Sequence, residues 1–481
     1  MLCSVNHPPT MASSSSPEIL SSINDLWRTM ISSFFKSRRP VFAAAFFLLP
    51  VFFYSWKFST EGPAANFALN PRILASVSYQ FCSAIGSMNS LLVPPFIDES
   101  DARKLVVPVK NLPVRVSERK ESSTDRKVEN EFKDMESCDL FNGDWVLDDS
   151  KPMYSPGSCP FIDDAFNCAR NGRPDSDFMR LRWQPSACSI TRLDGKTMLE
   201  MLRGKKMVFV GDSLNRNMWE SLACILRESL EDKSRVFEIS GRTKFKTGWS
   251  YAFRFSDYNC SIGFVRSPFL VQELEVYNST MSSPKPTLRL DVIDSSSSMY
   301  QDADIIIFNT GHWWTHEKTS RGKNYYQEGA FVHPELSVTK AYKKALSSWA
   351  KWVDENINPN KTRVFFRGFS ATHFRGGQWN SGGSCDWETT PITDDSYLKP
   401  YPKMMRILES VMAEMATPVV YLNITRMTDF RKDGHPSIFR DFVTERHSMH
   451  VQDCSHWCLP GVPDAWNEIL YALLLIASKH D

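Results

Sequence analysis

The chain has 481 residues, and 56 Lys and Arg against 55 Asp and Glu give a formal net charge of +1. This balance excludes a strongly basic nucleic-acid-binding protein and an acidic solvating tail as the dominant character of the chain. With 42% hydrophobic and 23% charged residues, the chain is neither intrinsically disordered nor a polytopic membrane protein.

One strongly apolar stretch, residues 40–58 (PVFAAAFFLLPVFFYSWKF), follows a serine-rich N-terminus, residues 1–39. As a helix, residues 40–56 would span roughly 25 Å, close to the ~30 Å hydrocarbon core of a bilayer, and the flanking aromatic residues extend it. The alternative is a signal peptide, but a leader usually lies within the first ~15–30 residues. We therefore expect a transmembrane signal anchor at 40–58 after a cytosolic tail at 1–39.

Charges and cysteines indicate which side of the membrane holds the rest of the chain. Three basic residues precede the apolar stretch and one, Lys57, follows closely, so the positive-inside rule places the N-terminus in the cytosol. Nine of the eleven cysteines lie between Cys138 and Cys458, as expected in an oxidising lumen, and an odd number leaves at least one without a partner among them. Candidate glycosylation sites are Asn259, Asn278, Asn360 and Asn423.

The segment that follows the anchor divides into a stem and a luminal catalytic domain. Residues 59–135 end in a charged stretch and indicate a stem or linker. The catalytic domain is expected at 136–481, with a Cys-rich N-terminal part (136–190) and an α/β part (191–481). The candidate disulfide cysteines of the first part are Cys138, Cys159, Cys168 and Cys188.

After residue 190, apolar runs typical of buried strands alternate with segments of helical spacing. In chain order we predict strand Lys206–Val210, helix Asn215–Leu230, strand Asp304–Phe308, helix Val338–Asn356, strand Arg363–Phe366, helix Met404–Met415, strand Pro418–Leu422 and helix Asp464–Ser478. Continuous apolar strands separated by helices favour a parallel sheet covered on both faces. The predicted fold class is α/β.

A candidate nucleophile, Ser213, follows the first of these strands in the sequence Gly211-Asp212-Ser213. The glycine permits a sharp turn, and the hydroxyl would lie at the carboxyl edge of the sheet beside the N–H groups of a helix N-terminus. Either Asp212 or Ser213 could instead serve only as a helix cap. The sequence is not the G-x-S-x-G elbow of α/β-hydrolases.

A serine nucleophile needs a base with an orienting acid, and Asp453 and His456 are the best such pair. Three residues apart, they would project to the same side of one helical turn. A purely structural histidine is the alternative. Cys454 and Cys458 flank His456 without the usual zinc spacing, and the His312–His316 pair lacks the glutamate of a zincin, so no metal site is expected.

Together, the two motifs resemble the plant trichome birefringence-like family of polysaccharide O-acetyltransferases, whose fold is similar to that of GDSL/SGNH esterases. Residues 211–213 match its G-D-S motif, and residues 453–467 match every fixed position of D-C-x-H-W-C-L-P-G-x-x-D-x-W-N. CDLFNGDWV and NGRPD are similar to its N-terminal domain, while Leu181-Arg-Trp183 stands where members often have Trp-Arg-Trp.

The resemblance implies Ser213 as nucleophile, His456 as base and Asp453 as the acid that orients it. It also implies a single-pass type II Golgi membrane protein that takes acetyl from acetyl-CoA or a related donor, with no bound cofactor. We expect the Ser213 N–H to stabilise the oxyanion of acyl transfer. Further oxyanion candidates are Gly211, Asp212, Asn217 and Asn309.

The implied acceptor is a cell-wall polysaccharide, whose sugar rings stack well on aromatic side chains. Candidate acceptor contacts are Arg216, Trp313, Trp314, Arg375, Trp379 and Trp457, although each tryptophan could equally pack a loop against the body. Xylan is the first choice of acceptor and pectin (homogalacturonan) the second. The same motifs would also suit an acetyl esterase that uses these residues, or a non-catalytic glycan-binding protein.

Overall fold

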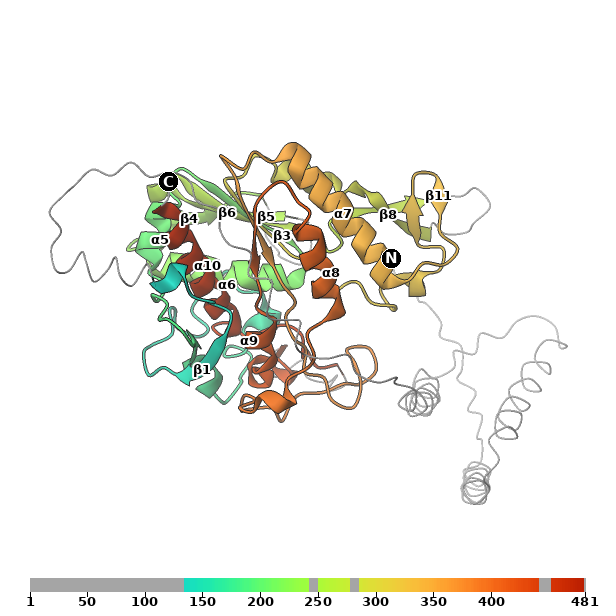
Figure 1. Cartoon of the computed structure of the whole chain (residues 1–481). Helices are drawn as coiled ribbons and strands as arrows, with labels where there is room; N and C mark the ends of the chain where they lie inside the picture. Colours follow the sequence, from blue (N-terminus) through green and yellow to red (C-terminus); the bar gives the residue numbers. More distant parts are fainter. Residues whose placement is uncertain (1–133, 242–249, 277–284, 441–450, 480–481) are drawn as a thin grey trace, which may run out of the picture. The chain divides into compact units, whose positions relative to one another are not determined.

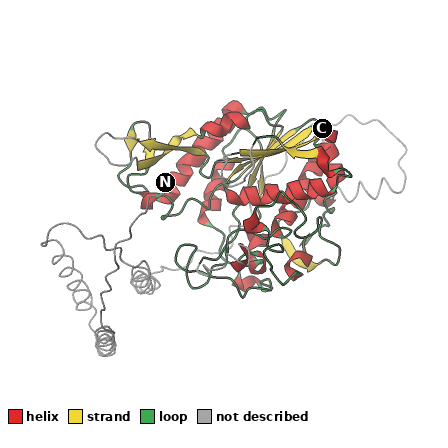
Figure 2. Cartoon of the chain, turned by 180° about the vertical axis from the view of Figure 1, so that it is seen from behind, coloured by secondary structure: helices red, strands yellow, loops and turns green. Residues whose placement is uncertain are grey.

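The computed structural model describes residues 134–241, 250–276, 285–440 and 451–479 (Figures 1 and 2). The expected tail (1–39), membrane anchor (40–58) and almost all of the stem (59–135) lie outside these ranges. In the part described, no helix combines the length and apolarity needed to cross a bilayer.

The main sheet has seven strands in the order β13-β12-β9-β3-β6-β5-β4. The first five are parallel: β13 (Val419–Leu422), β12 (Arg363–Arg367), β9 (Ile305–Phe308), β3 (Lys206–Gly211) and β6 (Cys260–Arg266). The last two strands pair differently: β5 (Ser250–Phe255) is antiparallel to β6, and β4 (Val236–Glu238) is antiparallel to β5. The four predicted strands are confirmed, but a wholly parallel sheet was wrong. A short turn joins β5 to β6, and a hairpin of this kind must be antiparallel.

Helices cover both faces of this sheet, so the α/β class is confirmed (Figures 1 and 2). Along β3, Met207 and Phe209 face one core while Val208 and Val210 face the other. The first core is completed by α5 (Gly195–Met201), α6 (Ser213–Glu228) and α10 (Val462–Ser478), and the second by α7 (Val338–Asn356) and α8 (Lys403–Met412). This alternation is what a strand buried on both sides requires.

A second, four-stranded sheet joins the core that α7 covers. Its order is β11-β10-β8-β7, with bounds β11 (Phe331–Val332), β10 (Tyr326–Glu328), β8 (Lys285–Ile293) and β7 (Val271–Val276). Leu288 and Leu290 of β8 belong to the same buried cluster as Tyr342 of α7. We did not predict this sheet because its strands alternate polar and apolar residues, whereas our prediction relied on continuous apolar runs.

The Cys-rich segment has little regular structure and is held by disulfides. Strand β1 (Gly143–Leu147) pairs antiparallel with β2 (Leu181–Pro185), and two short 3-10 turns, Asp164–Phe166 and Asp177–Arg180, lie between them. All four candidate cysteines are bonded, in the pairs Cys138–Cys188, Cys159–Cys224 and Cys168–Cys458. A fourth disulfide joins Cys385 to Cys454, and Cys260 is a buried free thiol.

Candidate active site

Ser213 lies just after a sharp turn between β3 and α6. Strand β3 ends at Gly211, whose φ of 150° falls in the region that favours glycine, and α6 begins at Ser213. A Cβ at position 211 would clash with the side-chain oxygen of Asn309. Glycine is therefore required for the close approach of Asn309. The turn brings Ser213 to the carboxyl edge of the parallel strands, where open α/β sheets bind their ligands.

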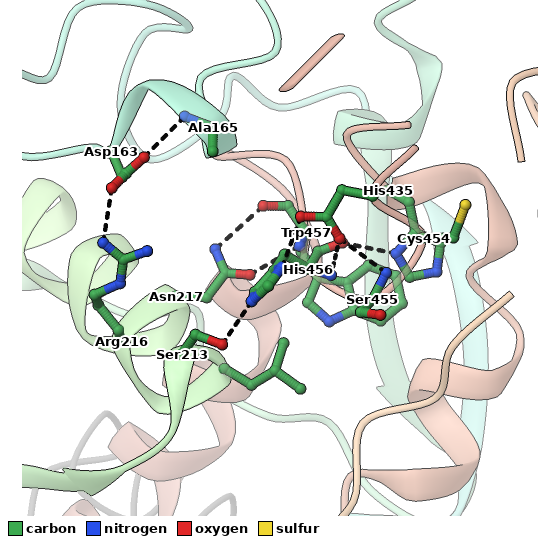
Figure 3. Close-up of polar contacts among 12 residues, drawn as sticks. Asp163, Ala165, Ser213, Arg216, Asn217, His435, Cys454, Ser455, His456 and Trp457 are labelled. Atoms are coloured by element: carbon green, nitrogen blue, oxygen red, sulfur yellow. Dashed lines mark hydrogen bonds and ion pairs between the residues drawn. The ribbon is translucent and has the colours of Figure 1, made fainter. Parts of the chain in front are cut away.

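The Ser213 hydroxyl contacts the His456 ring (Figure 3), and that ring contacts Asp453. Ser213 Oγ lies 2.7 Å from His456 Nε2, and His456 Nδ1 lies 2.7 Å from Asp453 Oδ2. Burial alone would raise the pKa of Asp453, but His456 and two backbone N–H groups hold that pKa well below its usual range. An ionised Asp453 fixes the tautomer in which Nδ1–H donates to the carboxylate and Nε2 accepts from the serine.

The turn that carries Asp453 and His456 differs from our prediction. We expected one helical turn, but residues 451–461 are not helical and the next helix, α10, begins only at Val462. Asp453 instead forms a β-bridge with Ser437. The side chain of Asp453 makes the local structure itself, because its Oδ1 accepts from the backbone N–H groups of Ser455 (3.1 Å) and His456 (3.0 Å). The three-residue spacing thus works through a side-chain turn and not through a helix.

Two disulfides anchor the loop at residues 451–461, here called the catalytic loop, on either side of His456. Cys454 is bonded to Cys385, and Cys458 is bonded to Cys168 of the Cys-rich segment. Both flanking cysteines are therefore covalently fixed close to the base. Rigid support of this kind holds a catalytic ring in productive geometry.

Asn217 holds the same loop from α6, so its predicted role as an oxyanion donor was wrong. Its Nδ2 donates to the Trp457 carbonyl (3.1 Å), and its Oδ1 accepts from the Trp457 N–H (2.8 Å) (Figure 3). Trp457 is fully buried, and its Nε1 donates to Ser370 Oγ (2.8 Å). Trp457 is therefore a core residue, and the prediction that it contacts a sugar was also wrong.

Asp212 and Asn309 bind each other at the turn. The Asp212 N–H donates to Asn309 Oδ1 (3.0 Å), and Asn309 Nδ2 donates to Asp212 Oδ1 (2.8 Å). Asn309 is only 1% exposed. Gly211 is paired in register with Arg266 within the sheet, and it contributes the shape of the turn. The Ser213 N–H, at the start of α6, is the oxyanion candidate that these contacts leave in place.

Buried polar and charged groups contact Asp212 in the turn between β3 and α6. Arg367 is fully buried, with a guanidinium nitrogen 3.8 Å from Asp212 Oδ1, and His312 Nδ1 lies 3.4 Å from Asp212 Oδ2. Burial lowers the pKa of Arg367 to about 10. Although burial opposes it, His312, Arg367 and Asn309 hold the pKa of Asp212 well below its usual range. Asp212 is thus an anion that caps α6, where its Oδ1 accepts from the Leu214 N–H.

Arg216 and Trp314 have partners within the protein. An Arg216 guanidinium nitrogen lies 2.7 Å from Asp163 (Figure 3). The same nitrogen lies 3.6 Å from Glu220, and the group packs over Phe166. Arg216 therefore joins the Cys-rich segment to α6. Trp314 is 5% exposed and donates from Nε1 to Thr310 Oγ1 (2.8 Å).

Three of the predicted acceptor contacts are accessible. Trp313 is partly exposed, while Trp379 and Arg375 are exposed. Lys318 Nζ lies 4.2 Å from the ring centroid of Trp313 and 5.3 Å from that of Trp379, and Arg266 lies 5.1 Å over Trp313. Aromatic rings and positive charges thus gather where β6 and β9 end, on either side of β3.

The candidate glycosylation sites differ in accessibility. Asn259 and Asn360 are exposed, whereas the side-chain oxygen of Asn423 is buried. Asn278 lies outside the described residues.

Sequence reasoning missed Phe166, His435, Lys318 and Arg266. The ring centroid of Phe166 lies 5.0 Å from that of His456, and His435 binds the His456 carbonyl. No local signal pointed to either residue, because long-range contacts bring them to the site. Arg266 follows a short apolar run, residues 262–265, and that run was a usable signal for a further strand.

Metal ligation has no support among the residues that the structure describes. No group of three or more His, Cys, Asp or Glu side chains there could hold an ion. Both Cys454 and Cys458 are disulfide-bonded, and His312 contacts Asp212 and the Ser370 carbonyl.

Two family models match the chain. One, described as the GDSL/SGNH-like Acyl-Esterase family found in Pmr5 and Cas1p, matches residues 190–473, and the other, the PMR5 N terminal Domain, matches residues 136–189. Among curated relatives from Arabidopsis thaliana, Protein trichome birefringence is 57% identical over 74% of this chain and 59% of its own length. Protein trichome birefringence-like 1 is 57% identical over 75% and 64%, and Protein trichome birefringence-like 4 is 58% identical over 73% and 78%. The match therefore spans about three fifths of the length of the first two relatives.

Proposed function

Because the chain belongs to the GDSL/SGNH-like acyl-esterase family found in Pmr5 and Cas1p, we propose that it is a serine acyltransferase that acetylates a plant cell-wall polysaccharide. The observation that carries the proposal is the contact of Ser213 with His456, which lies 243 residues later in the sequence and also contacts Asp453. The three side chains meet at the carboxyl edge of the sheet. The acetyl donor is acetyl-CoA or a related activated acetyl, and the protein needs no bound cofactor.

The first half of the reaction transfers acetyl to the enzyme. Ser213 Oγ attacks the carbonyl carbon of the thioester while His456 Nε2 takes the hydroxyl proton. The Ser213 N–H stabilises the tetrahedral oxyanion, and Asp453 stabilises the imidazolium. The C–S bond then breaks, and His456 gives its proton to the departing thiolate, which leaves acetyl-Ser213.

The second half transfers acetyl to the acceptor. A sugar hydroxyl attacks the acetyl-Ser213 carbonyl while His456 takes its proton, and the bond from the carbonyl carbon to Ser213 Oγ breaks. Ser213 recovers the proton from His456, so the enzyme is regenerated. If water replaces the sugar, the same steps give an esterase, and exclusion of water from acetyl-Ser213 decides between the two outcomes.

Xylan remains the first choice of acceptor, with Trp313 and Trp379 as stacking surfaces. Homogalacturonan is the second candidate, and one observation favours it. Lys318 and Arg266 place two positive charges beside Trp313, and a uronate carboxylate is complementary to them. The phosphates of acetyl-CoA would be complementary as well, so a panel of neutral and acidic oligosaccharides is needed to separate the acceptors.

We place the protein in the Golgi membrane as a single-pass type II protein with residues 136–481 in the lumen. The apolar stretch 40–58, the basic residues before it and the four disulfides support this proposal.

The decisive experiment compares the full-length protein with its Ser213→Ala variant in acetyl transfer from acetyl-CoA to defined xylo- and galacturono-oligosaccharides, detected by mass. We expect acetylated product from the wild type and a loss of about 10⁴-fold or more in the variant. Near-wild-type activity of the variant would refute the nucleophile. Free acetate in excess of acetylated glycan would favour the esterase. Undiminished rescue of a plant mutant by a Ser213→Ala, His456→Ala variant would favour a non-catalytic glycan-binding protein.

A further inference from the structure

Two buried histidines lie behind the catalytic loop and take no part in the proposed reaction. His435 is 2% exposed and follows the 3-10 turn Lys432–Gly434, and His373 is 8% exposed and lies in the loop after β12. Their rings contact each other, with His373 Nδ1 2.7 Å from His435 Nε2. The His435 ring also stacks on the ring of Trp457, the residue that follows His456, with 4.1 Å between the ring centroids.

The outer nitrogens of the pair both contact backbone carbonyls. His435 Nδ1 lies 2.7 Å from the carbonyl oxygen of His456 (Figure 3), and His373 Nε2 lies 2.9 Å from the carbonyl oxygen of Asp429. A carbonyl oxygen can only accept a hydrogen bond, so each of these nitrogens must carry a proton.

The contact between the rings needs a proton as well. Two bare imidazole nitrogens at 2.7 Å would repel each other, so either His373 Nδ1 or His435 Nε2 is an N–H. The three hydrogen bonds together require three N–H protons on two rings. A neutral imidazole carries one, so the pair holds one positive charge when all three hydrogen bonds are formed.

The surrounding charges favour His373 as the ring that carries it. Asp429 Oδ1 is buried 3.6 Å from His373 Nε2 and has no other hydrogen-bond partner in the described structure. On the same side, the backbone N–H of Lys399 donates to Asp429 Oδ2, while the Lys399 ammonium donates to the carbonyl of Thr372. The carboxylate of Asp429 therefore lies beside the His373 ring and contacts Lys399 only through a neutral backbone donor.

His435 has a different environment. An Arg173 guanidinium nitrogen donates to the carbonyl of His435 (2.9 Å), and Asp453 provides the nearby negative charge. Burial, followed by the charge of His373, lowers the pKa of His435 well below its ordinary value, which keeps this ring neutral. His435 is then a neutral Nδ1–H donor whose Nε2 accepts from His373.

We propose that His373 and His435 form a charged hydrogen-bonded pair that positions the catalytic loop, through the carbonyl of His456, for proton transfer from Ser213. The inference rests on the proposed roles of Ser213 and His456. His435 Nδ1–H donates to the His456 carbonyl, and the N–H of the charged His373 ring fixes that orientation of His435. Removing the donor from His435 should therefore slow the reaction of Ser213.

Two substitutions of His435 separate donation from mere space filling. In His435→Asn the amide nitrogen takes the place of Nδ1 and still donates to the His456 carbonyl, whereas in His435→Gln it takes the place of Nε2 and cannot. The readout is the rate at which a fluorophosphonate probe labels Ser213 in the full-length protein, which needs neither acetyl donor nor glycan.

We expect His435→Asn to label within about threefold of the wild type, because its amide keeps the donor to the His456 carbonyl. His435→Gln should label about 10- to 100-fold more slowly, the usual effect of removing a residue that orients a catalytic group. Equal rates for the two variants would overturn the proposal.

The charge of the histidine pair can also be measured directly in the wild type, so this test does not depend on whether a variant folds. In the full-length protein labelled with ¹⁵N-histidine, the two rings should show three protonated nitrogens near neutral pH. Only two at neutral pH would overturn the charged pair. A wild type that the probe does not label would contradict the proposed nucleophile instead, while the proton count would still decide the charge of the pair.

Discussion

Buried carboxyl groups around the site have opposite pKa shifts, and their partners explain the difference. Asp212 and Asp453 accept several hydrogen bonds, and their pKa values are held below the usual range despite burial. Glu220, fully buried on α6, is dominated by burial, which raises its pKa to about 8. The only cation that contacts Glu220 in the described residues is Arg216, whose guanidinium nitrogen lies 3.6 Å from the Glu220 carboxyl. The same nitrogen lies closer to Asp163, at 2.7 Å, so one guanidinium is shared by two carboxyls.

This arrangement makes stability depend on pH through Glu220. Its folded pKa exceeds the unfolded value, so the native state binds more protons and stability falls as pH rises from about 4.5 through about 8. Glu220→Gln removes this titration and keeps the oxygen that accepts from the Asp163 N–H. At pH ~9 we expect the free energy of unfolding of the variant, measured by urea titration, to exceed that of the wild type by at least about 1 kcal/mol. At pH ~5 the two proteins should have similar free energies of unfolding.

The difference between the two proteins isolates Glu220, because the neighbouring carboxyls Asp464 and Glu468 titrate in both. Their pKa values are raised to about 6 and about 7 by burial, and they contribute equally to both curves. Parallel stability curves for wild type and variant over this pH range would show that Glu220 stays ionised in the folded protein.

At the scale of elements, the Cys-rich segment supports the proposed active site. Cys168 is bonded to Cys458, two residues after His456, and Phe166 packs on the His456 ring. The backbone carbonyl of Phe166 also accepts from the Leu459 N–H (2.9 Å). The segment therefore fixes the loop that carries the base, whereas the sheet and α6 fix the nucleophile.

Two matched disulfide deletions test this division. Cys168→Ala with Cys458→Ala releases the catalytic loop, while Cys138→Ala with Cys188→Ala removes a crosslink within the Cys-rich segment. Each deletion should lower the free energy of unfolding by about 2–5 kcal/mol. Fluorophosphonate labelling of Ser213, measured well below either melting temperature, should slow about tenfold or more only in the first variant. Equal slowing in both would indicate that global stability, and not the position of the loop, sets reactivity.

The sequence predicted those elements whose signal is local. Helix α7 begins and ends at the predicted residues, Val338 and Asn356, because a regular apolar face and Ser337 as N-cap define it. The Gly211–Ser213 turn was predictable for the same reason. The Asp453–His456 turn was predicted wrongly as helical, although the hydrogen bonds of the Asp453 side chain that shape it are local. The β-bridge and the two disulfides to distant residues that accompany the turn could not be read from the sequence.

At the scale of the whole molecule, sequence reasoning failed mainly over which polar groups are already occupied. Asn217, Asn309 and Arg216 have the right chemistry for a site, yet each binds a partner distant in the sequence. Residue type can be read from one sequence, whereas the satisfaction of a buried donor depends on tertiary contacts. The contact of Ser213 with His456 was first inferred from the need of a serine nucleophile for a base, and the resemblance of both motifs to those of one family made the inference specific.

Attachment of glycans tests the proposed orientation of the whole chain. With the N-terminus in the cytosol, residues after the anchor pass through the lumen, where exposed sequons are glycosylated. We expect the full-length protein from plant microsomes to shift on endoglycosidase treatment, and Asn360→Gln to lose one glycan, because Asn360 is exposed. Asn423→Gln is the matched control and should change nothing, since the Asn423 oxygen is buried. An unglycosylated protein whose C-terminal part is digested by protease added outside intact microsomes would reverse the proposed orientation.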